Sequence, residues 1–544
     1  MRRYPTAALI SLLLSSAAVS QFTERIDVRV HELEVVVETR DGKPVTDLQK
    51  DDFIVLQDGV EQTITNFSVV NESAATASAS ARAAEAPRSA AAPPRKPRKF
   101  IFYLDEFAMH DTTRKDLLRQ CAELVGVMRE GDEAMVVTPA SPQRIPLFFT
   151  PDKTVLMTTL DRVTSEMMRK EPVLQLDHLG GESPSSPDDR VLRRGDCGQS
   201  PQKCAEERLG VLRSVVEALG QLPGKKVLVL MTTQMTSVPG LTLTNPGETP
   251  SDTIKGLLRP GIVSEFRDLR RLVNEVGRTA AANNVLIYGL ETYEPGNQAL
   301  PGVSVEEGRT SGHDNASLTR SSKRGQEGTQ DLLLTLADTT GGRAFSGTRE
   351  AGEMFEQISQ DLAVYYSIGY RDTESKAKGH KVEVRLRNHP ELVVRTRRNV
   401  RTQTAEDEER GKAMSAVLSS SIPNPLGIRL TASPLVRKGR TLEIPIHVHV
   451  PLSRLTFAED GDKYTGQFKV LVAAVGEHAD FGQSQVEHAQ DIVVPQARWA
   501  AAQTQEFRYD TTVRVSPGRY RIAVGVTDMN SGESGFQTFT VNAQ

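Results

Sequence analysis

The stretch KFIFYLDEFAM (99–109) decides the fold class of this chain, because an uninterrupted apolar run ends abruptly at an acid. Runs of this kind are typical of strands that helices cover on both faces. Two more follow, KVLVLM (226–231) and VLIYGL (285–290), and segments with helical spacing of apolar residues lie between them. This alternation over residues 99–364 predicts a doubly wound, mostly parallel sheet with helices on both faces.

Three long polar insertions interrupt this α/β region, at about residues 171–202, 237–260 and 294–326. Long loops on a rigid scaffold commonly carry binding specificity. We therefore expect the insertions to contribute to recognition at the rim of the sheet.

The beginning of the chain is typical of an export signal. Residues 1–20 contain Arg2 and Arg3, an apolar run over 7–19 and a small-x-small end before Gln21. As a helix the run would span only about 20 Å, short of the ~30 Å hydrocarbon core of a bilayer. The sequence thus predicts cleavage after Ser20, no membrane span afterwards, and a periplasmic or extracellular protein.

Composition excludes several classes of function. The chain has 544 residues, 25% charged and 38% hydrophobic, which indicates several soluble domains. The net charge is −4, and becomes −6 when the two signal arginines are removed, so binding to nucleic acid by bulk positive charge is excluded. Only 3 cysteines are present, too few for a disulfide-dense scaffold.

The predicted export affects how the cysteines are interpreted. Cys197 and Cys204 flank a short polar loop and are predicted to form a disulfide in an oxidising compartment. Cys121 has helical spacing with Leu117, Leu124 and Val125, which predicts a buried free thiol.

The regions flanking the α/β domain are predicted to be β-rich, and the whole chain to be a multidomain α/β plus all-β protein. Period-two alternation and Asp-Gly turns indicate strands on both sides. The expected segments are a small β module (21–70), a disordered Ala/Pro/Arg linker (71–98), a β extension (365–400), a connecting helix (401–426) and an Ig-like β-sandwich (427–544).

Three stretches carry a family resemblance: DGKPVTDLQKDDFIVLQDGVEQTITNFSVV (41–70), LDE (104–106) and YYSIGYRD (365–372). Together they resemble the bacterial von Willebrand factor A-related proteins of the Acidobacterial type, over residues 27–400. The resemblance implies an A-type domain between a small β module and an aromatic-rich strand.

The resemblance also implies a divalent-cation site above the carboxyl ends of the strands, with an Asp-x-Ser-x-Ser motif, a loop threonine and a later aspartate. Asp105 matches the first position, but Phe107 and Met109 replace both serines, and Thr232-Thr233 follows the strand after which the last aspartate belongs. Thr150 matches the loop threonine. With only Asp105 and Thr150 as ligands, and Glu106, Asp111 or Thr112 as possible substitutes, we expect a degenerate site and no cofactor, with weak binding of Mg²⁺ or Ca²⁺ as the alternative.

Other constellations are ambiguous. His447 and His449 lie on one face of a predicted strand, where they either face water or join His478 or His488 in a metal site. The sequence contains no Gly-x-Ser-x-Gly, P-loop, dinucleotide fingerprint or His-Glu-x-x-His motif.

These observations predict an exported, non-enzymatic, adhesion-like protein that binds an unknown protein partner and no nucleic acid. Partner binding is expected at the carboxyl edge of the A-type sheet, near Asp105, Glu106, Thr150, Thr232 and Thr233. One alternative is a structural or assembly factor of the cell envelope. Another is an unrecognised hydrolase, for which the sequence places no paired base and nucleophile.

Overall fold

The computed structural model describes fifteen stretches of the chain: residues 29–71, 97–105, 111–126, 128–138, 145–169, 201–232, 235, 262–291, 328–346, 351–372, 379–402, 404–420, 422–476, 483–486 and 489–543. The predicted signal, nearly all of the linker and the insertions at 237–260 and 294–326 lie outside them. Of the first insertion only the last two residues are described, and they begin a helix.

Six strands form the central sheet, in the order β10-β9-β8-β5-β6-β7. Neighbouring strands are parallel, except that β7 runs antiparallel to β6. Because the chain adds strands first on one side of β5 and then on the other, the strand order reverses between β5 and β8. The bounds are β5 (Lys99–Leu104), β6 (Glu133–Val137), β7 (Leu147–Thr150), β8 (Lys226–Thr232), β9 (Val285–Glu291) and β10 (Ala344–Ser346).

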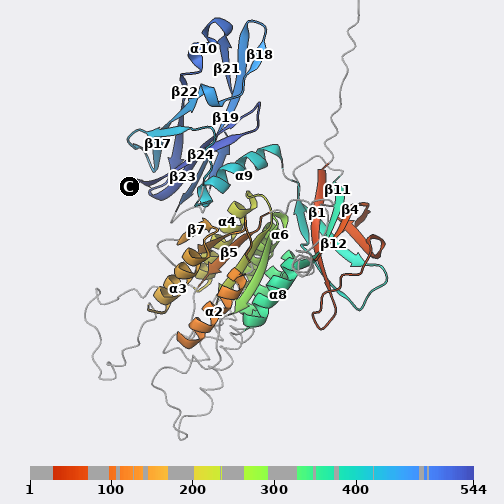
Figure 1. The fold of residues 1–544 in the computed structure, drawn as a ribbon. Helices are drawn as coiled ribbons and strands as arrows, with labels where there is room; N and C mark the ends of the chain where they lie inside the picture. The colour runs from red at the N-terminus through yellow and green to blue at the C-terminus, as the bar shows by residue number, and fades with distance from the viewer. Residues whose placement is uncertain are drawn as a thin grey trace, which may run out of the picture.

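Helices cover both faces of this sheet, as the buried apolar runs predicted (Figure 1). Successive strand residues face opposite sides, so Phe100 and Phe102 lie in one apolar cluster and Ile101 and Tyr103 in the other. One face packs against α4 (Pro201–Gly220), α6 (Ile262–Ala282) and a helix over 328–340. The other packs against α2 (Asp111–Gly126), α3 (Lys153–Arg169) and α8 (Ala351–Ala363). We call this assembly the α/β unit.

The segments before and after the α/β unit, predicted as a small β module at 21–70 and a β extension at 365–400, fold together into what we call the β unit. One sheet has the order β13-β1-β11-β4 and the other β14-β12-β2-β3. Alternation shows which face of a strand is buried but not which strand pairs with it. The sequence pattern therefore did not reveal that strands of the two segments pair with each other. The bounds are β1 (Arg29–Glu38), β2 (Phe53–Gln57), β3 (Val60–Gln62), β4 (Ile64–Asn71), β11 (Val364–Asp372), β12 (Gly379–Leu386), β13 (Val393–Arg395) and β14 (Asn399–Arg401).

Two antiparallel sheets with one shared apolar core form the end of the chain, which we call the C-terminal unit. The first sheet consists of β15 (Arg429–Ala432), β16 (Val436–Lys438), β17 (Thr441–Pro451) and β22 (Glu506–Val515). The second consists of β18 (Ala458–Asp460), β19 (Lys463–Gly476), β20 (Gln483–Val486), β21 (Gln490–Pro495), β23 (Gly518–Asp528) and β24 (Ser534–Ala543). A short helix, α10 (Trp499–Ala502), precedes β22.

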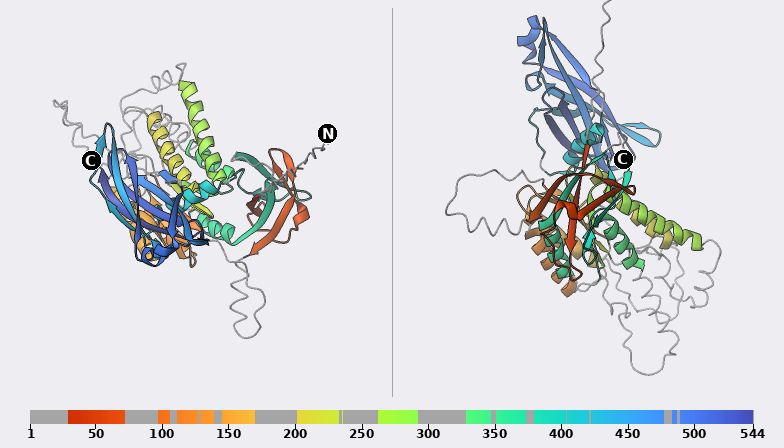
Figure 2. Two further views of the ribbon diagram at one scale, coloured as in Figure 1. Left: turned by 90° about the horizontal axis from the view of Figure 1, so that it is seen from above. Right: turned by 90° about the vertical axis from the view of Figure 1, so that its right-hand side faces the viewer.

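Helix α9 (Ala405–Leu418) lies between the α/β unit and the C-terminal unit (Figures 1 and 2). Its first turn is capped by Thr404, whose hydroxyl accepts a hydrogen bond from the backbone N–H of Asp407. Its apolar side chains belong to the same cluster as Leu222 of the α/β unit and Leu471 of β19. The two units therefore share one continuous core.

Two smaller predictions concern single features. Cys121 is a buried free thiol, as predicted, and burial raises its pKa to about 12, so it is not a nucleophile at neutral pH. Among the helices of the described stretches, none is long and apolar enough to cross a membrane.

Candidate functional site

Three polar side chains lie side by side at the carboxyl edge of the central sheet. Asp105 follows β5, Thr232 ends β8 and Glu291 ends β9. Thr232 is in register with Glu291, and Met231 before it with Leu104. Asp105 and Thr232 are 0% exposed and Glu291 is 1% exposed. Open α/β sheets bind ligands at this edge where the strand order reverses, so this is the candidate site.

The Asp105 carboxylate is neutralised from inside the protein. Its Oδ2 accepts a 2.7 Å hydrogen bond from Thr232 Oγ1 and a 3.1 Å bond from Nη1 of Arg208 on α4. The Arg208 side chain is only 12% exposed. Burying a carboxylate without a counter-charge costs several kcal/mol, and an ion pair at this distance offsets a cost of that order. Arg208 is therefore the cation that allows Asp105 to stay buried.

The neighbouring polar groups hold the chain that surrounds Asp105. The Thr232 hydroxyl donates to Asp105 and accepts a 3.0 Å hydrogen bond from the backbone N–H of Met235. The Glu291 carboxylate accepts a 3.1 Å hydrogen bond from Gln330 on the 328–340 helix. These bonds fix the exits of β8 and β9 relative to the helices.

The described residues at this edge do not supply the ligand set of a divalent cation. Mg²⁺ and Ca²⁺ require six or more oxygen ligands around an open position. Here one oxygen of Asp105 is shared by a hydroxyl and a guanidinium, and the sequence has Phe107 and Met109 at the serine positions. The guanidinium supplies the positive charge that a metal would supply. Among the described residues, no group of three or more His, Cys, Asp or Glu side chains is placed to hold a metal.

Thr150 does not join Asp105, so this part of the predicted site was wrong. Thr150 is the last residue of β7, and it lies opposite Ala134 near the beginning of β6. Because β7 is antiparallel to β6, its carboxyl end is at the amino edge of the parallel strands. There Thr150 Oγ1 accepts a 3.1 Å hydrogen bond from the backbone N–H of Asp152, just before α3.

Several predicted residues fall outside the described stretches. These are Glu106 and Thr233 of the expected binding edge and Cys197 of the expected disulfide. Cys204 lies in α4, but its side chain is not described. The disulfide therefore stays a prediction.

Sequence reasoning missed Arg208 and Glu291. Glu291 follows the apolar run 285–290 as Asp105 follows the run at 100–104, and this signal could have identified it. Arg208 has no comparable signal, because a polar residue on an amphipathic helix normally faces water. Only the packing of α4 against the sheet edge brings it to Asp105.

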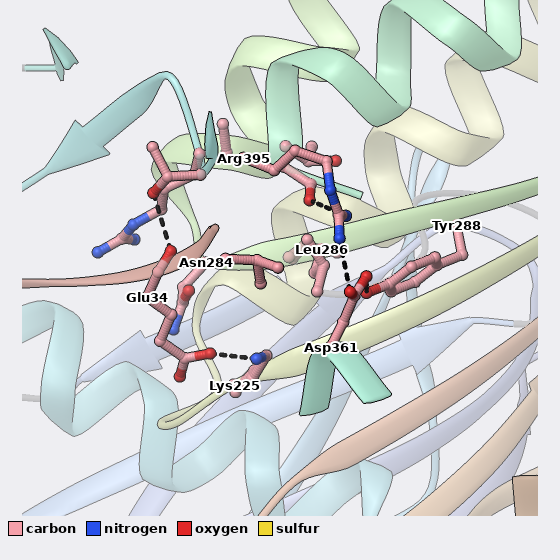
Figure 3. Close-up of a pocket in the computed structure, with 14 residues that line it drawn as sticks. Glu34, Lys225, Asn284, Leu286, Tyr288, Asp361 and Arg395 are labelled. Carbon is pink, nitrogen blue, oxygen red and sulfur yellow. Dashed lines mark hydrogen bonds and ion pairs between the residues drawn. The ribbon is translucent and has the colours of Figure 1, made fainter. Parts of the chain in front are cut away.

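The β unit is joined to the amino side of the α/β unit by buried ion pairs (Figure 3). Glu34 of β1 pairs with Lys225, and Arg395 of β13 donates a 2.5 Å hydrogen bond to Asp361 of α8. Tyr288 also donates to Asp361, at 2.7 Å. Burial, and next the charge of Asp361, raise the pKa of Tyr288. The cavity between these residues measures about 30 Å³, room for about two water molecules.

The histidines of β17 occupy a polar sheet face, and the other two that were considered with them, His478 and His488, are outside the described stretches. His447 Nδ1 is 2.7 Å from Asp510 Oδ1 and its Nε2 is 2.9 Å from Ser433 Oγ. Arg508 Nη2 lies 2.8 Å from the same Nδ1. Ser433, His447 and Asp510 are thus linked by contacts of the kind found in the triad of a serine hydrolase. Arg508 competes with Asp510 for the Nδ1 atom of His447.

No family model matches the chain, and no curated protein matches it. Among solved structures, it is similar to the human COPII-coat protein Sec24c, with 10% identity over 58% of this chain and 45% of that one and a TM-score of 0.23. An aerotolerance-related membrane protein from Bacteroides fragilis NCTC 9343 has 9% identity over 49% of this chain and 99% of that one, with a TM-score of 0.23. Thus this chain spans less than half of the Sec24c chain. At such TM-scores neither likeness carries an argument about function.

Proposed function

We propose that this chain is an exported, non-enzymatic interaction protein, built on a von Willebrand A-type domain whose cation site has been replaced by an internal ion pair. The doubly wound sheet and the acid after its first strand support the A-type assignment. The two sheets with a shared core support an Ig-like sandwich at the C-terminus. The predicted export signal supports a periplasmic or extracellular location.

The Arg208–Asp105 ion pair is the observation that carries the proposal. A catalytic carboxylate or a metal site needs an oxygen that a substrate or ion can reach. In contrast, Asp105 is fully buried, and the guanidinium of Arg208 already offsets its charge. This geometry can position the segments that follow the strands, but it cannot itself touch a partner.

Partner contacts are accordingly assigned to the surface around this edge, with Asp105, Thr232 and Arg208 as positioning residues. The segments that directly follow β5, β8 and β9 contain Glu106, Thr233 and the insertions 237–260 and 294–326. A rigid polar base at the points where these segments begin limits the conformational entropy that binding must otherwise cost.

The proposal is tested by capture of partners from envelope and medium fractions with the native chain as bait. Arg208→Gln should weaken capture, and so should deletion of residues 294–326. The matched control is Arg213→Gln on the same helix, whose ion pairs are exposed, and it should capture normally. Undiminished capture by both altered proteins would refute the binding edge. A stoichiometric complex that resists salt would instead favour the envelope assembly factor.

Titration calorimetry with Mg²⁺, Ca²⁺ and Mn²⁺ tests the cation replacement. We expect no binding by the mature protein. Micromolar binding that Asp105→Ala abolishes would show that the cation site is functional and that Arg208 moves aside.

A second candidate, a serine hydrolase, rests on Ser433, His447 and Asp510. The two hydrogen-bond distances suit a nucleophile and its base, but the contact with Arg508 opposes the tautomer in which Nδ1 carries the proton. A fluorophosphonate probe tests it: labelling that Ser433→Ala abolishes, and that Thr431→Ala beside His449 leaves intact, would establish the activity. Absence of labelling would exclude it.

A further inference from the structure

A groove of about 700 Å³ lies between the α/β unit and the β unit. Its size is within the range of natural ligand sites, roughly 300–1,000 Å³. The α/β unit contributes the 328–340 helix, β10 and α8, and the β unit contributes β12 and β13. This groove is distinct from the carboxyl edge that holds Asp105.

One buried polar atom of its lining, Gln357 Oε1, has no hydrogen-bond partner among the described residues. The guanidinium groups of Arg343 and Arg395, by contrast, face acids: Arg395 Nε is 3.4 Å from Glu38 Oε1, and Arg343 Nε is 3.8 Å from Asp361 Oδ2. Buried polar atoms are normally paired, so an unpaired acceptor beside the groove indicates a missing donor. A backbone N–H of an extended peptide is a donor of this kind.

The strands beside the groove favour an extended ligand. β10 is the outermost described strand of the central sheet, and β13 is the outermost described strand of its own sheet. Residues of both line the groove, Ala344 and Phe345 from β10 and Val394 from β13. The outer edge of a strand presents backbone N–H and C=O groups that an added strand can pair with.

The side chains indicate the composition of that strand. Lys381 lines the groove and enters no ion pair with any described residue, whereas Arg398 beside it is paired with Asp338. Leu334 on the rim is 57% exposed, which is high for a leucine. A carboxylate would pair with Lys381, and an apolar side chain of the ligand would cover Leu334.

We propose that this groove binds an extended peptide segment of a partner protein, carrying a carboxylate opposite Lys381 and an apolar side chain against Leu334. The segment adds as a strand beside β10 or β13, and one of its backbone N–H groups donates to Gln357 Oε1. This site is independent of the binding edge proposed above, so either can fail without the other.

A displayed library of random linear peptides, panned on the full mature chain, tests the proposal. The enriched peptides should contain Asp or Glu within apolar, β-branched sequence and lack proline. In fluorescence anisotropy, Lys381→Glu should weaken their binding by about tenfold or more, since an attraction becomes a repulsion. Leu334→Glu should also weaken it. Lys463→Glu, a change at a half-exposed lysine of the C-terminal unit, is the matched control and should have no effect.

Because Lys381 and Leu334 are exposed, these changes should leave folding intact, which thermal unfolding will verify. Failure to enrich any peptide over the Lys381→Glu protein would overturn the proposal. So would equal affinity for wild type and both altered proteins. A photo-cross-linker at position 334 that reacts only within its own chain would show that the groove is filled internally, which also overturns it.

Discussion

The β unit contacts the α/β unit through buried ion pairs, whereas the contact with the C-terminal unit is formed mainly by apolar side chains, those of α9 among them. In the first interface Arg343 and Arg395 are paired with Glu38 and Asp361, and both acids are under 10% exposed. In the second, α9 belongs to a cluster that continues from the α/β helices to β19 and β23.

The difference teaches how each interface is specified. Burying charge costs free energy that only well-placed opposite charges offset, so the ion pairs permit one orientation and tolerate no missing partner. Apolar contact is less directional and grows with buried area, so it fails when atoms are added to a packed surface. The predictions below separate these two behaviours.

Removing one charge from the first interface should have the largest effect. Arg395→Met leaves Asp361 and Glu38 buried with one cation fewer, and should lower the free energy of unfolding by about 3–5 kcal/mol. Denaturant unfolding measures it. Arg398→Met is the control: its pair with Asp338 is more than half exposed, so a loss of no more than about 1 kcal/mol is expected. Equal losses would show that the buried pairs do not hold the interface.

Adding one methyl group to the second interface should have the next largest effect. A Cβ on Gly411 of α9 would lie 2.1 Å from the backbone oxygen of Gln221, the residue directly after α4. Gly411→Ala should therefore cost about 2–3 kcal/mol. Gly210→Ala on α4 meets no atom within 4 Å and should be neutral or stabilising by up to about 1 kcal/mol, from helix propensity. A stable Gly411→Ala protein would mean that α9 is loosely packed.

The pH dependence of stability should report on Lys226, which is 1% exposed. Its Nζ donates a 2.9 Å hydrogen bond to Leu222 O. Burial, and then the charges of Arg397 and Lys99, lower its pKa from 10.5 to about 7. Between these values the unfolded chain holds a proton that the folded chain has lost, so stability should rise with pH by about 1.4 kcal/mol per pH unit.

The same stability is lost as pH falls from about 10.5 to about 7, and below that Lys226 contributes no further change. Lys226→Met should remove this rise and make the protein more stable near neutral pH. The comparison is made by urea unfolding of both proteins across the window. Parallel curves for wild type and Lys226→Met would contradict the assignment.

The smallest expected effects concern how salt changes the stability that each interface contributes. Lys225→Gln removes a pair with Glu34, and Arg521→Gln removes a 2.7 Å hydrogen bond to Ser419 O and a stack over Phe148. Each should cost about 1 kcal/mol at low salt. High salt should shrink the Lys225 effect, because its partner is charged, and leave the Arg521 effect nearly unchanged. A salt-dependent loss for Arg521→Gln together with a salt-independent loss for Lys225→Gln would contradict these assignments.

The central sheet was predictable because its signals are local. Runs such as 100–104 and 226–231 are apolar throughout, and that pattern requires cover on both faces wherever the strand lies. The same rule placed Asp105 and Thr232 at one edge, because parallel strands end together. Thr150 was misplaced because the direction of a short strand leaves no trace in its composition.

The sequence by itself determined which segments are buried and where strands end, since burial follows from the polarity of neighbouring residues. The tertiary structure alone decided the partners. It placed β11 (Val364–Asp372) between β1 and β4, both of which end before residue 72. It also brought Arg208 to Asp105, which it follows by 103 positions. Strand pairing and ion pairing depend on distance in space, and no local pattern encodes that distance.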